Sequence, residues 1–200
     1  PASVTNQEVS NQGTFEFHSA TSDAVAAALS ELDIPVTTDL VVMEVTPSTP
    51  AAGKLKLGDQ LRAFNGRELT DIATLRSLLA KAQPGDAVKL TLLRGKTERT
   101  VSIKLGKSDK GKPLIGVFLM ENYNGPMRIE FALDNVGGPS AGLAFALAIY
   151  DELTPGALLN GRIVAVTGTI EPDGKVGAIG GLHQKMVSAA RAGAKVLLIP

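Results

Sequence analysis

The sequence predicts an α+β protein of two domains, in which a β-rich domain precedes one that mixes helices and strands. Between residues 39 and 105, short β-rich segments alternate with proline and glycine turns around a single helix. After residue 113, apolar strands lead into a glycine-rich turn and a helix of small apolar residues. The polar segment 107–112 separates these stretches and predicts the domain boundary, with a solvated hairpin inside one domain as the alternative.

Each expected element follows from apolar periodicity and from the residues that start or stop it. Val25, Leu29 and Leu32 recur at helical spacing behind a cap at Ser22 or Asp23. The predicted elements are a helix at 21–32, strands at 40–45 and 60–65, a helix from Asp71 that Pro84 and Gly85 stop, a hairpin of 88–93 with 100–105, strands at 115–120 and 127–133, a helix after Ser140, and a short helix within 180–194.

Composition excludes several classes of function. The 20 basic and 20 acidic residues give a formal net charge of zero, so we expect no nucleic-acid partner. The absence of cysteine excludes a disulfide framework, a thiolate zinc site and a cysteine nucleophile, and two histidines exclude a histidine-rich metal site. We therefore expect no metal and no cofactor. No apolar run approaches the roughly 20 residues of a membrane span.

The segment around residues 45–69 carries two tight-turn signatures with a strand between them. Gly58-Asp59 and Asn65-Gly66 flank the strand, and Pro50-Ala51-Ala52 precedes them. In this order the segment resembles a PDZ domain of the bacterial protease type over residues 35–107. The resemblance implies that an extended peptide adds as a strand between a sheet edge and the helix. The Gly-Leu-Gly-Phe loop that binds a carboxylate in that family is absent from the sequence.

A serine stands where the second domain turns from a strand into a helix. Gly137 and Gly138 permit close approach of a ligand to the backbone, and Ser140 lies beside the free N–H groups of the following helix. Such a turn favours negative charge, so it could hold a phosphate or stabilise the oxyanion of an acyl-transfer reaction. A plain helix cap at Ser140 is the alternative.

The helix within 180–194 adds a lysine. At about 100° per residue, Lys185 shares a face with Leu182, Met186 and Ala189, whereas Gln184, Ser188 and Arg191 are expected to point away. A lysine on such a face either extends to solvent or, when desolvated, serves as a neutral base toward a serine. His183 lies about 200° from Lys185 and His18 is distant in sequence, so a Ser-Lys dyad fits better than a Ser-His-Asp triad.

Four segments of this domain resemble the proteolytic domain of the Lon family, in that family's order: 138–142, 166–170, 176–185 and 194–200. The resemblance implies a fold similar to domain 2 of ribosomal protein S5, truncated here at its C-terminal end. It implies Ser140 as nucleophile, Lys185 as base and Thr167 as the residue that orients the lysine. The turn of Gly137, Gly138 and Pro139 before Ser140 is expected to supply the oxyanion site.

Two departures from ATP-dependent Lon proteases bear on mechanism. Gly137 stands where they usually carry an aspartate, and the sequence contains no G-x-x-x-x-G-K-[ST] phosphate loop. A PDZ-like module followed by a Lon-like domain resembles the bacterial PDZ-containing Lon-like proteases. The domains expected are a lead-in at 1–34, the PDZ-like domain at 35–107 and the serine protease domain at 108–200.

That resemblance also carries expectations about activity and location. It implies an ATP-independent serine endopeptidase that cuts unfolded or exposed protein segments, with the PDZ-like groove for substrate recognition or regulation. It implies a membrane anchor upstream of this sequence, domains on the extracytoplasmic side of the cell membrane, and a homo-oligomer such as a hexameric ring. The alternatives are a non-catalytic PDZ adaptor with a protease-like scaffold, and a small-molecule kinase of the galactokinase type that binds phosphate at the Ser140 turn.

Overall fold

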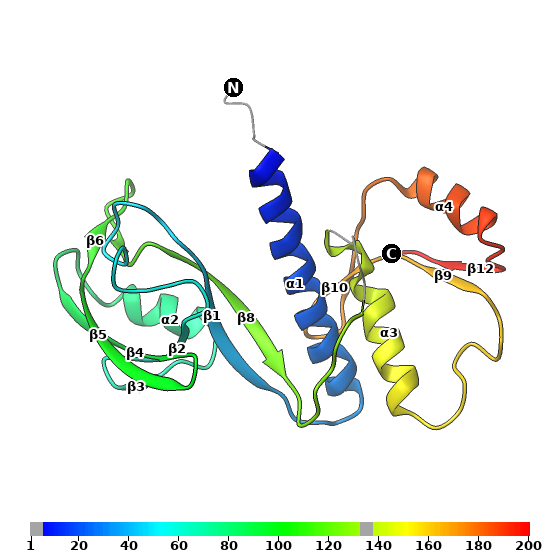
Figure 1. The fold of residues 1–200 in the computed structure, drawn as a ribbon, viewed down its shortest axis with the longest axis horizontal. Helices are drawn as coiled ribbons and strands as arrows, with labels where there is room; N and C mark the ends of the chain where they lie inside the picture. Colours follow the sequence, from blue (N-terminus) through cyan, green and yellow to red (C-terminus); the bar gives the residue numbers. More distant parts are fainter. Residues whose placement is uncertain (1–5, 133–137) are drawn as a thin grey trace. The chain divides into compact units, whose positions relative to one another are not determined.

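The computed structural model describes residues 6–132 and 138–200, with side chains from residue 13 onward. The chain divides into two compact units, drawn as a ribbon in Figure 1. Unit 2 comprises residues 38–122, and unit 1 combines the chain up to Thr37 with residues 123–200. Unit 2 is therefore inserted in the sequence between the N-terminal helix and the remainder of unit 1.

Unit 2 is built on one sheet with the strand order β5-β4-β2-β1-β8, and β3 pairs with β2. The pairs β1–β2, β2–β3, β2–β4 and β4–β5 are antiparallel, and Arg94 pairs with Thr97 at the end of the β4–β5 hairpin. Its elements are β1 (Thr37–Val45), β2 (Gln60–Phe64), β3 (Arg67–Glu68), α2 (Ile72–Leu79), β4 (Ala87–Arg94), β5 (Thr97–Lys104), β6 (Gly106–Lys107), β7 (Pro113–Leu114) and β8 (Val117–Asn124).

The inward positions of these strands form the core of unit 2. Leu40 and Val42 of β1, and Leu90 and Leu92 of β4, alternate along their strands and are fully buried. Helix α2 starts where Asp71 accepts a hydrogen bond from the backbone N–H of Thr74. This amphipathic strand-and-helix arrangement confirms the PDZ-like α+β fold expected from the sequence.

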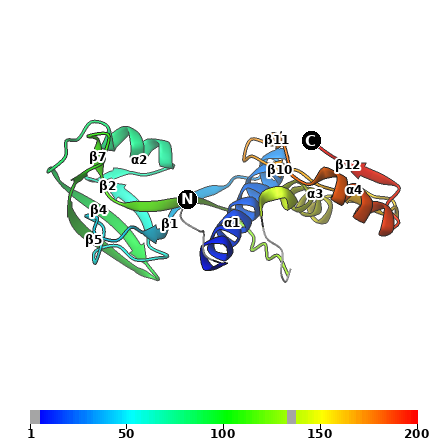
Figure 2. The ribbon, with the colours of Figure 1, turned by 90° about the horizontal axis from the view of Figure 1, so that it is seen from above.

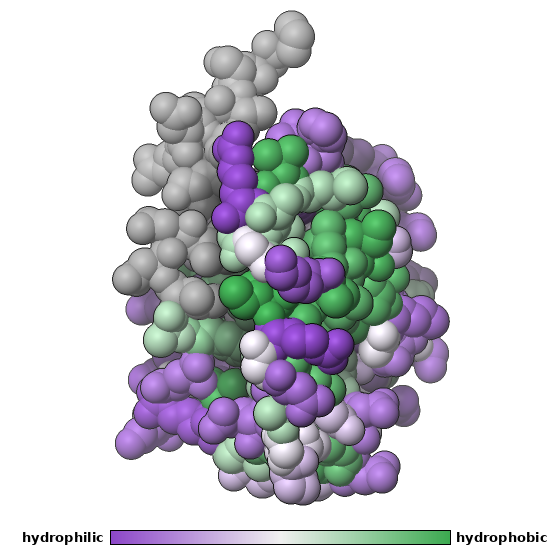
Figure 3. Space-filling model, turned by 90° about the vertical axis from the view of Figure 1, so that its right-hand side faces the viewer, coloured by the Kyte–Doolittle hydropathy of each residue, from purple (hydrophilic) through white to green (hydrophobic). Residues whose placement is uncertain are grey.

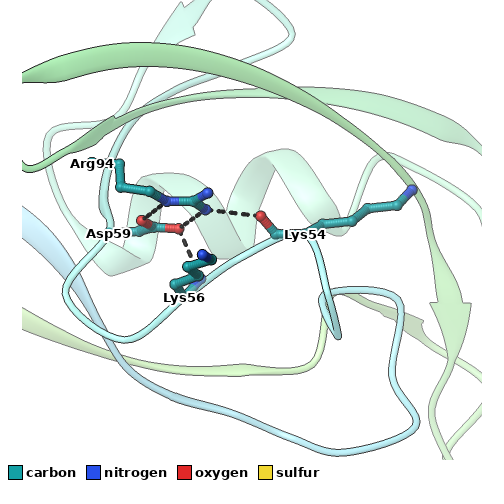
Figure 4. Close-up of polar contacts among 4 residues, drawn as sticks. All are labelled: Lys54, Lys56, Asp59 and Arg94. Carbon is teal, nitrogen blue, oxygen red and sulfur yellow. Dashed lines mark hydrogen bonds and ion pairs between the residues drawn. The ribbon is translucent and has the colours of Figure 1, made fainter.

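A buried ion pair fixes the loop before β2. Arg94 donates to both carboxylate oxygens of Asp59 at 2.7 Å, and the backbone N–H of Lys56 donates to the same group at 2.8 Å (Figure 4). Arg94 also donates to the backbone carbonyl of Lys54 at 2.9 Å. Burial alone would raise the pKa of Asp59, but the Arg94 and Lys56 hydrogen bonds outweigh it and lower that pKa.

Unit 1 pairs two long helices with short strands. Its elements are α1 (Asn6–Glu31), the 3-10 helix η1 (Pro139–Ala141), α3 (Gly142–Leu153), β9 (Val164–Val166), β10 (Thr169–Ile170), β11 (Val176–Gly177), α4 (Leu182–Arg191) and β12 (Val196–Leu198). Strand β12 runs parallel to β9, and β10 pairs antiparallel with β11. Figures 1 and 2 show α1 lying alongside α3.

The core of unit 1 lies between α1 and α3. Ala24, Ala28 and Leu29 from α1 pack with Phe145 and Ile149 from α3. Small residues on α1 permit close approach of the two helices, since alanine side chains leave little between the backbones. None of the helices in the described part of the chain combines the length and the apolar character that a membrane crossing requires.

The structure moves three boundaries relative to the sequence expectations. Helix α1 starts at Asn6 instead of residue 21, and it belongs to unit 1 because its apolar face packs on α3. The strand expected at 115–120 for the protease domain is β8, which pairs with β1 in unit 2. The boundary therefore falls after residue 122 instead of at 107–108. The described part of the strand expected at 127–133 is irregular, although Ile129 and Phe131 pack against the core.

Candidate active site

Three polar side chains from separate elements meet in unit 1. Lys185 Nζ on α4 donates to Ser140 Oγ at 2.8 Å and to Thr167 Oγ1 at 3.0 Å. Thr167 Oγ1 in turn donates to the backbone carbonyl of Ser140 at 3.2 Å. The structure thus brings together the nucleophile, base and orienting residue expected from the sequence, although 45 positions separate Ser140 from Lys185.

The turn that carries Ser140 is fixed by backbone contacts. Gly138 precedes η1 with a φ of 81°, a conformation that favours glycine, and Pro139 takes the first helical position. The backbone N–H of Gly168 donates to the Ser140 carbonyl at 2.9 Å, and that of Leu143 donates to the Gly168 carbonyl at 3.1 Å. The nucleophile turn is therefore attached to the segment between β9 and β10.

Glycine is required at 168 for this close approach. A Cβ on Gly168 would lie 3.0 Å from Val176 Cγ1 and 3.3 Å from Leu143 Cβ. A side chain there would push the Gly168 backbone away from the Ser140 turn. The glycine that follows Thr167 thus allows close packing against Val176 and Leu143, which the sequence motif alone did not reveal.

Thr167 is held more firmly than the two residues it contacts. Its side chain is buried, whereas Ser140 and Lys185 are half-buried. Its backbone N–H donates to the Leu198 carbonyl at 3.0 Å, which links the site to β12. With donor and acceptor both engaged, the Thr167 hydroxyl has one favourable orientation and can hold the lysine amine in place.

Lys185 reaches the serine across a pocket of about 500 Å³ beneath α4. Gln184 and Ser188 line this pocket, so the expectation that they point away from Lys185 was wrong. Three residues of helix turn a side chain by about 300°, which places Ser188 only about 60° from Lys185. Met186 is 50% exposed, so the face expected to be apolar and buried is partly open in this structure.

The two-stranded sheet separates this pocket from a second one. Ala165, Thr167 and Leu197 line the pocket that holds Ser140 and Lys185, together with α4. Alternate residues of the same strands, Val164 and Val196, line an apolar pocket of about 510 Å³ against α3. Figure 3 shows apolar side chains gathered on the face of unit 1 that turns toward the viewer. Helices α3 and α4 thus lie on opposite faces of the sheet.

The remaining site expectations concern the oxyanion turn and the histidines. Gly137 lies outside the described residues. Pro139 has no backbone N–H and so cannot donate to an oxyanion, which leaves Gly138 and Ser140 as described donors in this turn. His18 and His183 are exposed. Among the residues that the structure describes, no cluster of three or more His, Asp or Glu side chains could hold a metal ion.

A second candidate feature lies in unit 2, where β8 stands at one end of the strand order of the sheet. Glu121 on this strand accepts a hydrogen bond from the backbone N–H of Ile72 at 2.7 Å, which places β8 next to the start of α2. A sheet edge beside a helix is the geometry in which a peptide adds as a strand. This edge was not predicted from the sequence, because the strand at 115–120 was expected in the other domain.

Two known families match successive parts of the chain. The family described as PDZ domain matches residues 10–105, and the Lon protease (S16) C-terminal proteolytic domain matches residues 134–200. The chain therefore combines a PDZ domain with a Lon-type proteolytic domain. This confirms the resemblance to PDZ-containing Lon-like proteases that the sequence motifs indicated.

Individual relatives cover parts of the chain. The Lon protease of Desulfatibacillum aliphaticivorans is 30% identical over 127 residues, 56% of this chain and 15% of that protein. The Lon protease of Trichlorobacter lovleyi is 48% identical over 63 residues, 32% of this chain and 8% of that protein. The chain thus spans a small part of the length of these relatives.

Solved structures also match part of the chain. The PDZ domain of an SdrC-like protein from Listeria monocytogenes is 30% identical, covering 40% of this chain and 85% of that one, with a TM-score of 0.39. A structure from Geobacillus thermodenitrificans is 28% identical and covers 40% of this chain and 94% of that one, with a TM-score of 0.37.

Proposed function

We propose that this chain is a serine endopeptidase in which Ser140 is the nucleophile and Lys185 the general base. The observation that carries the proposal is the 2.8 Å contact between Lys185 Nζ and Ser140 Oγ. Nucleophile and base within hydrogen-bond reach, with the base oriented by a third group, is the arrangement that activates a serine. Thr167, at 3.0 Å from the amine, is the third group.

The reaction begins from the uncharged amine of Lys185. The amine takes the hydroxyl proton of Ser140 as Oγ attacks the carbonyl carbon of a peptide bond. The tetrahedral intermediate expels the amine of the departing fragment, which receives that proton from Lys185, and an ester remains on Ser140. Water then attacks the ester with Lys185 again as base, releasing the acid and restoring the serine.

The negative charge that develops on the carbonyl oxygen needs donors that are already in place. The backbone N–H groups of Gly138 and Ser140 belong to the turn that leads into α3, where the helix dipole also favours negative charge. Pro139 contributes by fixing the turn without donating. This assignment places the oxyanion next to the backbone N–H groups of Gly138 and Ser140.

Substrate selection follows from what the chain contains. Its sequence has no phosphate-binding loop of the Walker type, so these residues supply no ATP-driven unfolding. We assign unfolded segments or exposed tails as substrates and ATP-independent cleavage as the activity. The edge of β8 beside α2 is the surface that would bind such a peptide as an added strand.

Location and assembly belong to the same proposal. We assign the protein to the extracytoplasmic side of the cell membrane, held by an anchor, and to a ring of copies of itself. Fractionation of cells with an antibody to unit 2 tests the location, and sedimentation of the purified full-length protein tests the assembly. Recovery of the protein in the soluble cytoplasmic fraction, or as a monomer at micromolar concentration, would count against these assignments.

The activity is tested by cleavage of an unfolded reporter such as casein, without ATP, by the full-length protein. Ser140→Ala and Lys185→Ala are expected to abolish cleavage, because each removes one half of the dyad. Lys195→Ala, an exposed lysine of the same unit, serves as the matched control and should cleave normally. Cleavage that survives in Ser140→Ala would overturn the dyad. If neither the parent protein nor any variant cleaves the reporter, the non-catalytic adaptor becomes the better hypothesis.

A further inference from the structure

Helix α1 reaches the nucleophile turn at two points, one helical turn apart. Glu16 Oε2 lies 3.9 Å from the place a Cβ on Gly138 would occupy, and the Ala20 carbonyl oxygen lies 3.7 Å from the corresponding place on Gly142. Gly138 and Gly142 stand two residues before and two residues after Ser140. Residues four apart lie on one face of a helix, so a single face of α1 contacts both sides of the nucleophile.

The opposite side of the turn is also occupied. A Cβ on Gly142 would lie 3.0 Å from Ile170 Cγ2 and 3.2 Å from the Ile170 backbone nitrogen. The Gly168 N–H holds the Ser140 carbonyl from the same side. The turn is therefore enclosed between α1 and the segment that runs from Thr167 to Ile170.

The contact between α1 and the Ser140 turn is tightly packed. Ala20 is 4% exposed, and further along the helix Ala24 and Leu29 are fully buried in the core shared with α3. Phe17, between Glu16 and Ala20, meets the ring of Phe145 edge-on with centroids 5.8 Å apart. A shift of α1 at Ala20 would have to move the start of α3 or the turn that precedes it.

We propose that α1 positions the nucleophile, with Ala20 and Glu16 as positioning residues for the reaction assigned to Ser140 and Lys185, an inference that rests on the proposed function. The helix that precedes unit 2 in the sequence is thus part of the catalytic unit. Lys185 Nζ and Ser140 Oγ lie on different elements at 2.8 Å, so their distance depends on the placement of the turn as well as on the Thr167 contact that holds the amine. A displacement of about 1 Å in such a pair lowers the rate by about 100-fold.

The test compares two enlarged alanines on the same helix, in the full-length protein. Ala20→Leu adds volume beside the Ser140 turn, and Ala27→Leu adds the same volume in the α1–α3 core away from it. Ala20→Leu is expected to lower kcat by about 100-fold with KM unchanged, and Ala27→Leu to keep kcat within about threefold. Ala20→Gly, which adds no volume, should restore kcat, and Ala20→Val replaces Ala20→Leu if the larger variant does not fold.

Hydrogen exchange provides a readout that does not depend on activity. The amides of Gly168 and Leu143 close the hydrogen bonds that attach the turn, so their exchange should accelerate in Ala20→Leu and stay unchanged in Ala27→Leu. Equal acceleration in both variants, or a kcat for Ala20→Leu within about threefold of the parent, overturns the positioning role. If the parent protein shows no Ser140-dependent cleavage, the proposed function fails, and the exchange comparison alone decides whether α1 holds the turn.

Discussion

Replacing Thr167 with valine removes one hydroxyl and leaves the shape of the side chain almost unchanged. That hydroxyl accepts from Lys185 Nζ at 3.0 Å and donates to the Ser140 carbonyl at 3.2 Å. The Ser140 carbonyl keeps its second donor, the Gly168 N–H, so the turn retains one attachment. The lysine, in contrast, keeps its contact with Ser140 Oγ and loses the group that orients it.

The size of the effect follows from the kind of hydrogen bond that is lost. In the reactive form the lysine amine is uncharged, so the lost bond is a neutral one that contributes about 1 kcal/mol, which corresponds to a fall in kcat/KM of roughly fivefold for Thr167→Val. The neutral bond to the carbonyl contributes about 1 kcal/mol to folding, so the melting temperature should drop by only a few degrees. The assay is steady-state cleavage of a quenched fluorescent peptide, with circular dichroism to follow unfolding.

The serine variant separates the hydroxyl from the methyl group. Thr167→Ser keeps the hydroxyl and should retain most of the activity, whereas Thr167→Val should not. Activity of Thr167→Val within about twofold of the parent would refute the orienting role, because a hydroxyl that can be removed without loss does not hold the lysine.

Two further predictions concern stability. Asp59→Asn should lower the free energy of unfolding of unit 2 by about 2 kcal/mol at neutral pH, because it loses charged hydrogen bonds to Arg94 and Lys56. The pKa of Asp59 is lowered from 3.8, so this stabilisation is present above that value and is lost as the pH falls through the folded-state pKa. Urea unfolding at several pH values should therefore show the stabilities of the parent and the variant converging in acid. A constant difference between them would contradict the ion-pair account. Gly142→Ala should destabilise unit 1 by about 1–3 kcal/mol, because its Cβ would meet the Ile170 backbone nitrogen at 3.2 Å. The control is Gly180→Ala, whose Cβ would have no atom within 4 Å and which should melt like the parent protein. Equal melting temperatures for the two variants would contradict the packing argument.

The structural features that the sequence predicted best are those that depend on residues close together in the chain. Gly58, Asn65 and Gly66 adopt positive φ values of 82°, 50° and 78°, as expected for residues placed at two tight turns. The meeting of Ser140 with Lys185 was also predictable, since the spacing of glycines, threonine and lysine indicated the family whose fold brings them together. Local signals and motif order thus sufficed for the turns and for the contact between Ser140 and Lys185.

The parts that the sequence did not predict depend on partners distant in the chain. The apolar pattern of 115–120 indicates a strand but not that β1 is its neighbour, because antiparallel partners are chosen by the whole sheet. The extent of α1 and its contact with the Ser140 turn required the position of α3, which periodicity within 21–32 does not contain. The position of Ser188, in contrast, could have been predicted from the sequence, because three residues of helix place its side chain only about 60° from that of Lys185.

The central claim, that Ser140 is a nucleophile activated by Lys185, is tested most directly by covalent labelling of the full-length protein with a fluorophosphonate, read by peptide mass spectrometry. A serine whose proton is taken by a neighbouring amine reacts with this reagent, and an ordinary surface serine does not. The account predicts a single adduct on Ser140 that forms in the parent and in Lys195→Ala and is lost in Lys185→Ala. Labelling of Ser140 at the same rate in Lys185→Ala, or an adduct on a different serine, would contradict it.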